Sequence, residues 1–324
     1  MGRFTQTPSD AVLQNVLEVY ERGLTVDALR RAENFAPLKN WGGIRGCVVA
    51  TRIAANAGAQ RLATHLTIRA WRTDPTHPEA QLQYGFHLSE RRGPLALWRA
   101  MRGWKMHPEA SSDQRAELLA LRTRTASDLR DFAAAEKFIG EAEATSHAPW
   151  IRLQRAHLLE RQDHVEKALE VAHSAVGLHR HPFYRPAIQT IAHLLQQLDR
   201  DEEAIELLKQ ANAVLQSGPV AAQLYGLLSE NNRWAEAEAA LTRYVEMSPL
   251  LELPLQKWVS SQRARAAHHQ GKRELAADIA RSLDDALHKY FLKNLEAGSG
   301  NGGRVQLDVS FIRQHFKTCA PATL

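Results

Sequence analysis

Small and apolar residues recur along this chain as pairs of positions that lie seven residues apart. The first members of the pairs are alanines, at intervals of 33, 39, 33, 36, 33 and 39 residues: Ala63, Ala96, Ala135, Ala168, Ala204, Ala237 and Ala276. Five of the second members are Ala or Gly, and the full set is Ala70, Gly103, Ala142, Ala175, Ala211, Tyr244 and Leu283. Since seven residues make two helical turns, both members of a pair lie on one helix face. The pattern predicts a series of helices that pack closely through small side chains.

A turn signal precedes the predicted helices, and a proline follows several of them. Gly58 and Gly271 lie five residues before their alanines, and Gly93 lies three before. Polar residues take similar places in three other units: Asp163, Asp201 and Asn232. Proline cannot continue a helix, so we expect units to end near Pro75, Pro108, Pro149, Pro182 and Pro249. The chain is therefore predicted to repeat a helix–turn–helix unit about every 34 residues.

This repeating unit resembles the tetratricopeptide repeat. Residues 131–136 (Asp-Phe-Ala-Ala-Ala-Glu) and 234–237 (Trp-Ala-Glu-Ala) are typical of the opening of that family's second helix, and an earlier unit surrounds Gly23 and Ala28. The resemblance implies an all-α fold over residues 1–296, an α-solenoid of seven or eight helix hairpins in a right-handed superhelix. It also implies a scaffold whose concave groove, lined by the first helices, binds a protein or peptide partner.

The pattern changes after Glu296. Residues 297–303 (Ala-Gly-Ser-Gly-Asn-Gly-Gly) have the composition of a flexible linker. Apolar residues then alternate with polar ones at Val305, Leu307, Val309 and Phe311, which predicts a short strand. We therefore expect a different domain to begin within residues 304–324.

Residues 304–324 resemble the opening of a C39-like cysteine peptidase domain, which has a papain-like fold. The resemblance rests on a strand that leads to Gln314 and, five residues later, to Cys319 in the run Thr-Cys-Ala-Pro-Ala-Thr-Leu. It implies Cys319 as the nucleophile, activated at a helix N-terminus, and Gln314 as the side chain of the oxyanion hole. The family usually has Gly after the Cys, where this chain has Ala320, and its catalytic His lies downstream of the Cys.

Three interpretations follow from this tail. In the first interpretation, the chain is a binding solenoid that forms the N-terminal part of a cysteine peptidase. As it stands, it is then not catalytically competent, because no His or Asp follows Cys319. Alternatively, the complete protein is a hydrolase with Cys319 as its nucleophile. In the third interpretation the chain is a pure adaptor with a degenerate tail.

Composition narrows the function classes. The apolar runs are short and the N-terminus lacks a signal-peptide pattern, so we expect no membrane span and a cytoplasmic protein. The spacing of the histidines and the two cysteines favours neither a metal site nor a cofactor. Residues 1–130 carry 19 Lys+Arg against 12 Asp+Glu, and no acidic residue lies between Glu33 and Asp74. This basic stretch accompanies no nucleic-acid motif, so we expect a solvated helix face there and no nucleic-acid partner.

Overall fold

The computed structural model describes residues 5–105, 107–178 and 184–296, and these residues contain seventeen α-helices. Gln314, Cys319, the predicted linker and the predicted strand lie outside the described residues. The chain divides into two compact units. The first comprises Met1–Leu224 and Thr242–Glu252, and the second comprises Tyr225–Leu241 and the chain from Leu253 onward. Each unit is described separately.

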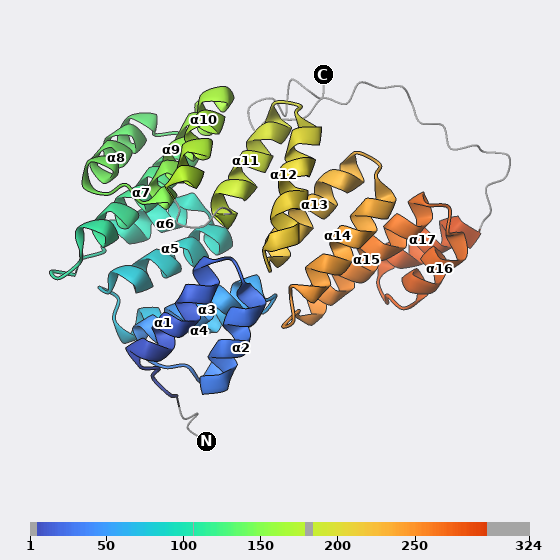
Figure 1. The fold of residues 1–324 in the computed structure, drawn as a ribbon, viewed down its shortest axis with the longest axis horizontal. Helices are drawn as coiled ribbons and strands as arrows, with labels where there is room; N and C mark the ends of the chain where they lie inside the picture. The colour runs from blue at the N-terminus through green and yellow to red at the C-terminus, as the bar shows by residue number, and fades with distance from the viewer. Residues whose placement is uncertain (1–4, 106, 179–183, 297–324) are drawn as a thin grey trace. The chain divides into compact units, whose positions relative to one another are not determined.

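The helices follow one another as antiparallel hairpins (Figure 1). The hairpins of the first unit are α1 (Asp10–Glu21) with α2 (Thr25–Phe35), α3 (Ile44–Asn56) with α4 (Gln60–Thr73), α5 (Pro78–Arg92) with α6 (Pro94–Met101), α7 (Ser112–Asp128) with α8 (Phe132–Thr145), α9 (Pro149–Arg161) with α10 (Val165–Gly177), and α11 (Arg185–Gln197) with α12 (Asp201–Val214). A single 3-10 turn, Leu38–Asn40, connects the first hairpin to the second. The remaining helices are α13 (Gly218–Glu230), α14 (Trp234–Glu246), α15 (Leu253–His269), α16 (Arg273–Arg281) and α17 (Ala286–Glu296).

A residue with positive φ separates the two helices of each of the eight hairpins. These residues are Gly23, Gly58, Gly93, Arg130, Asp163, Asp199, Asn232 and Gly271. A left-handed residue reverses the chain directly after a helix and allows the second helix to start within a few residues. The predicted turn signals at Gly58, Gly93, Asp163, Asn232 and Gly271 are confirmed. The prediction at Asp201 is wrong by two residues, because Asp199 makes the turn and Asp201 is the first residue of α12.

The predicted small positions fill the interior of the hairpins. Ala135, Ala168, Ala204, Ala237 and Ala276 are fully buried, each as the fourth residue of a second helix. Two predicted pairs do not lie on one helix. Leu283 is buried but lies beyond the end of α16, which stops at Arg281. Gly103 is exposed and lies beyond the end of α6, because that helix stops at Met101 and a turn returns the chain.

Tryptophans from three helices pack against aromatic rings of other helices. Trp71 of α4 stacks on Tyr84 of α5 with ring centroids 4.4 Å apart, and Trp150 of α9 meets Phe86 edge to face at 6.0 Å. In the second unit Trp258 of α15 meets Tyr225 at 5.9 Å. Aromatic contacts of this kind add to the apolar area that stacking buries.

The first unit also closes on itself through contacts between residues far apart in sequence. The backbone N–H of Gln216, just after α12, donates to the carbonyl of Gly23 at 3.0 Å, and the Gln216 side chain bonds both the backbone N–H and the carboxylate of Asp27. After α14, Leu250 N–H donates to the Ala57 carbonyl at 2.9 Å. These bonds join positions 189 to 193 residues apart, whereas an open solenoid has contacts between neighbouring repeats alone.

In the second unit, α15, α16 and α17 share a small apolar core. Its buried residues are Ala267, Ala276, Ala277 and Leu295, and Phe291 and Leu292 pack against it. None of the helices that the structure describes is long and apolar enough to cross a membrane.

Candidate functional site

The first helices of consecutive hairpins in the first unit form one continuous layer. Helix α3 contacts α1 and α5, α7 contacts α5 and α9, and α11 contacts α9. The closure at Gly23 and Ala57 keeps the ends of the layer near each other.

Half-buried polar and titratable side chains from five of these helices lie within electrostatic range of one another, and we call the side of the layer that carries them its inner face. We call them the inner-face cluster, and its members are Tyr20, Arg52, Glu79, Glu117, Tyr184 and Arg185. Burial raises the pKa of Tyr184 to about 12, and the charges of Arg185, Glu117, Tyr20 and Arg52 also act on it. Tyr20 belongs to the first hairpin and Tyr184 to the sixth, so the cluster brings together hairpins that are far apart in the sequence.

Both signs of charge are present in the inner-face cluster. Burial raises the pKa of the Glu117 carboxyl, Arg52 opposes that shift, and Glu79 and Asp113 reinforce it. Asn56 donates to the Tyr20 hydroxyl at 2.9 Å and to the Arg52 carbonyl at 2.8 Å, which orients the tyrosine. Titratable groups with perturbed pKa values are typical of functional sites. This arrangement presents guanidinium donors, carboxylate acceptors and phenol groups to a polar ligand.

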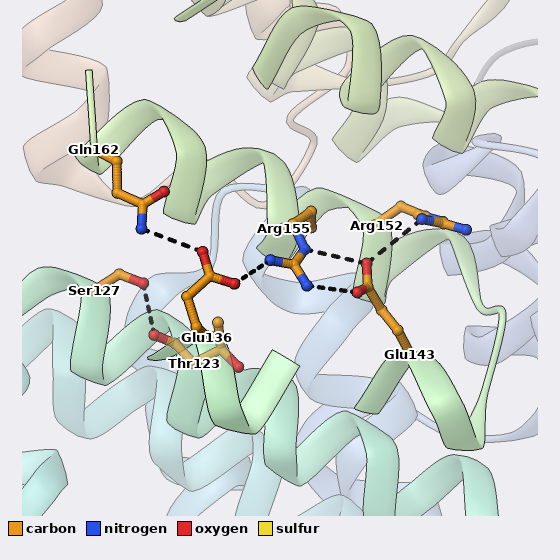
Figure 2. A network of polar contacts seen from close by, with 7 residues as sticks. All are labelled: Thr123, Ser127, Glu136, Glu143, Arg152, Arg155 and Gln162. Atoms are coloured by element: carbon orange, nitrogen blue, oxygen red, sulfur yellow. Dashed lines mark hydrogen bonds and ion pairs between the residues drawn. The ribbon is translucent and has the colours of Figure 1, made fainter. Parts of the chain in front are cut away.

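A second polar network fixes the fourth hairpin against the fifth (Figure 2). Arg155 of α9 bonds both carboxylate oxygens of Glu143 on α8, at 3.4 and 2.7 Å. It also bonds Glu136, which lies two helical turns before Glu143 on α8. Arg152 reaches Glu143 at 3.5 Å, and Gln162 donates to Glu136 at 3.2 Å. Burial alone would lower the pKa of Arg155, but these bonds outweigh it and raise the pKa. The bidentate geometry sets the position of α9 and therefore of the inner face.

A row of histidines and carboxylates joins α7, α9 and α11. The ring nitrogen Nε2 of His157 lies 3.1 Å from Asp128, and Nε2 of His193 lies 2.8 Å from Glu160. Arg161 pairs with Asp128 at 3.1 Å. Burial would raise the pKa of Asp128 and Glu160, but the histidine bonds and nearby charges outweigh it and lower both pKa values. The row ties three hairpins together near their turns.

In the second unit a serine, a histidine and an aspartate stand in hydrogen-bond sequence. Nδ1 of His288 lies 2.7 Å from Asp285, and Nε2 lies 3.0 Å from the Ser261 hydroxyl. Asp285 also accepts the backbone N–H of His288 and caps α17. Ser261 lies within α15, where backbone N–H groups already serve the helix and cannot form an oxyanion hole. The arrangement therefore fixes α17 to α15 by capping and hydrogen bonding.

The candidate site residues predicted from the sequence, Cys319 and Gln314, lie outside the described residues. The other cysteine, Cys47, is buried, and its thiol donates to the Trp41 carbonyl at 3.5 Å. Burial raises the pKa of the Cys47 thiol against the opposing effect of Arg69, which makes it a poor nucleophile. No group of three histidine, cysteine, aspartate or glutamate side chains within residues 5–105, 107–178 and 184–296 is placed to hold a metal ion. The sequence did not predict the inner-face cluster, because its residues belong to five helices without a common spacing.

No protein-family model matches the sequence, and no curated protein matches it either. Similar solved structures are the APC/C hetero-tetramer Cut9-Hcn1 (TM-score 0.56, 14% identity), the human IFIT1 dimer with PPP-AAAA (0.53, 16%), and a STAND protein with a tetratricopeptide repeat sensor from Pyrococcus horikoshii (0.53, 11%). The matches cover 89%, 87% and 86% of this chain, and 57%, 72% and 49% of the respective other chains. The chain thus spans little more than half the length of the Cut9-Hcn1 chain. At these identities the likeness concerns the fold, which is that of a tetratricopeptide-repeat solenoid.

Proposed function

We propose that this protein is a binding scaffold that holds a polar peptide segment of a partner protein against the inner face of its first unit. The observation that carries the proposal is the inner-face cluster, in which Arg52 and Arg185 stand with Glu79 and Glu117 on first helices from separate hairpins. A peptide laid across that face would pair its carbonyl and carboxylate groups with the guanidinium groups and its N–H groups with the carboxylates.

The chemistry of the cluster favours binding over catalysis. Burial raises the pKa of Tyr184 to about 12, so its phenol keeps its proton and can donate to a ligand. Cys47, the cysteine among the described residues, does not belong to the cluster and is buried elsewhere. A binding site of this kind requires no cofactor.

A phage-displayed peptide library selected on the full chain tests this proposal. The Kd of the selected peptide would then be compared for wild type, Arg52→Gln and Glu117→Gln. We expect about a tenfold or greater loss of affinity in each variant, because a buried charged hydrogen bond contributes on the order of 1.5–3 kcal/mol.

The matched controls are Arg200→Gln and Glu203→Gln, an exposed ion pair on α12 with 45% and 58% side-chain exposure. We expect no change in peptide affinity for these controls. The proposal is wrong if the selected peptides bind both inner-face variants as tightly as wild type.

We also propose, on sequence alone, that the solenoid is the N-terminal part of a cysteine peptidase related to the C39-like group. Its support is the run around Gln314 and Cys319. In that protein the solenoid would position a peptide substrate for Cys319. The test is the pH dependence of iodoacetamide labelling at Cys319 in a Cys47→Ser variant. A labelling rate that rises at a pH well below the usual thiol pKa of about 8.5 supports the proposal, and a rate that rises near that pKa contradicts it.

A further inference from the structure

Two adjoining hollows lie over α4 and α5, on residues that do not belong to the inner-face cluster. The first is lined by α4 and by Lys39 and has a volume of about 390 Å³. The second lies between α4 and α5 and has a volume of about 430 Å³. Ile68 and Arg72 line both, so the two hollows form one continuous recess, which we call the α4–α5 recess.

The lining of this recess is strongly basic. Its cations are Lys39, Arg69, Arg72, Arg91 and Arg92, and its titratable lining also includes His65 and His87. Neither hollow is lined by a carboxylate. Within the part of the chain that the structure describes, no carboxylate forms an ion pair with any of these five cations. Since Lys39, Arg72, Arg91 and Arg92 are also exposed, their charges are open to an external anion.

One cation of the recess, Arg69, has a structural role. The Arg69 guanidinium donates to the carbonyls of Lys39 and Trp41 at 3.1 and 2.9 Å, and so fixes the connection between the first two hairpins. Arg91 and Arg92 follow each other in the last turn of α5, and Arg72 lies in the last turn of α4. Three arginines from two neighbouring helices line one hollow, and arginine can bind carboxylates bidentately.

The floor of the recess is apolar and aromatic. Trp71 stacks on Tyr84 at an interplanar angle of 13° and lies 5.3 Å from Trp104. Ile68 and Leu88 complete the floor. The Trp71–Tyr84 stack covers one face of each ring, which leaves less aromatic surface for the stacking of nucleic-acid bases. The stacked rings instead provide a rigid seat for aliphatic side chains.

We propose that the α4–α5 recess binds an acidic segment of a partner protein in which carboxylates alternate with aliphatic residues. The carboxylates pair with Arg72, Arg91 and Arg92, and the aliphatic side chains contact Trp71 and Ile68. The chain's own residues 297–324 do not suit the recess, because they carry Arg304, Arg313 and Lys317 against the single carboxylate Asp308. The proposal adds a second interaction surface to the one on the inner face.

Fluorescence anisotropy with a labelled peptide of alternating glutamate and leucine tests this inference on the full chain. We expect the double variant Arg72→Glu/Arg91→Glu to weaken peptide binding at least about tenfold. The matched control is Arg22→Glu/Arg273→Glu, which makes the same change in net charge at residues outside the recess and is expected to bind within about twofold of wild type. Far-UV circular dichroism and thermal melting of both double variants check that the fold is intact.

Three results would overturn the proposal. The first is equal loss of binding in both double variants, which would indicate a response to net charge alone. The second is peptide binding that neither variant changes. The third is tighter binding of an oligoadenylate of equal charge that Arg72→Glu/Arg91→Glu abolishes, which would make the recess a nucleic-acid surface. Arg52→Gln, which tests the inner face, should leave binding of the glutamate–leucine peptide unchanged, so the two proposals can fail separately.

Discussion

The closure of the first unit leads to a quantitative prediction at Gly58. This glycine has φ +94° in the turn between α3 and α4, and a Cβ added there would lie 3.0 Å from the Cα of Leu251, in the segment after α14. Gly93 has a similar φ of +79° in the next turn, but a Cβ added there would have nothing within 4 Å. The two glycines thus share the backbone requirement and differ in the closing contact.

The two alanine variants should therefore differ in stability by the cost of that contact. A side chain at positive φ costs about 1–3 kcal/mol at either position, and Gly93, with ψ 172°, lies in a region that essentially only glycine adopts. Overpacking against the Leu251 backbone adds about 1–3 kcal/mol at Gly58 alone. We expect Gly93→Ala to lower the free energy of unfolding by about 1–3 kcal/mol, and Gly58→Ala to lower it by about 2–6 kcal/mol.

Urea unfolding measures this difference, and hydrogen exchange locates it. In wild type the N–H groups of Leu250 and Glu252 donate to the carbonyls of Ala57 and Gly58 at 2.9 and 3.3 Å. Gly58→Ala should reduce the exchange protection of these two amides, while Gly93→Ala should leave it unchanged. Equal destabilisation by both variants, with unchanged protection at Leu250, would refute the closure.

Two further predictions concern the polar networks between hairpins. Arg155→Ala should destabilise the protein by about 1–3 kcal/mol in urea unfolding, because it leaves the half-buried Glu143 without its bidentate partner. The control Arg200→Ala removes an exposed ion pair and should change stability by less than about 1 kcal/mol. Similar effects of the two variants would contradict the role of the network. Asp128 and Glu160 have lowered pKa values in the folded state. Their contribution to the free energy of unfolding is therefore fully present above the pKa of about 4 that they have in the unfolded chain, and it is lost as the pH falls through their lower pKa values in the folded state. Unfolding free energy measured at decreasing pH should fall below about pH 4, with a smaller slope in Asp128→Asn; an unchanged slope would contradict it.

The repeat was readable in the sequence because the helices pack closely at two fixed positions, where small side chains recur. Ala135 and Ala142 are fully buried in α8, and the same holds for Ala168 and Ala175 in α10. The exception at Gly103 has a local cause. The second helix of that hairpin begins at Pro94, directly after the Gly93 turn, and stops at Met101, so the second position of the pair falls outside it.

Turn positions were predictable only where the residue type favours positive φ. Glycine adopts this conformation without strain, and Asp and Asn are the next most tolerant residues. Arg130 has φ 62° and gives no such signal. Its turn is set by the helices around it, since α7 ends at Asp128 and Asp131 caps α8 by accepting the N–H of Ala134.

The inner-face cluster and the closing bonds were beyond local sequence patterns for one shared reason. Gln216 and Asp27 are 189 residues apart, and their contact exists because the curvature of successive hairpins brings them together. Curvature accumulates from small rotations at each hairpin, which no single spacing encodes. The basic stretch was visible in the sequence as a gap between Glu33 and Asp74, but its continuation to Arg91 and Arg92 depends on the packing of α4 against α5.

Closure also affects how the proposed inner-face site would bind. In a solenoid with contacts between neighbours alone, each interface can flex, and a ligand that bridges several hairpins must fix that motion at an entropic cost. Here the bonds from Gln216 to Gly23 and from Leu250 to Ala57 restrain the curvature of the first unit before any ligand arrives. A preorganised site of this kind loses less free energy on binding and discriminates more sharply among segments of different bulk, because it cannot widen without breaking the closing bonds.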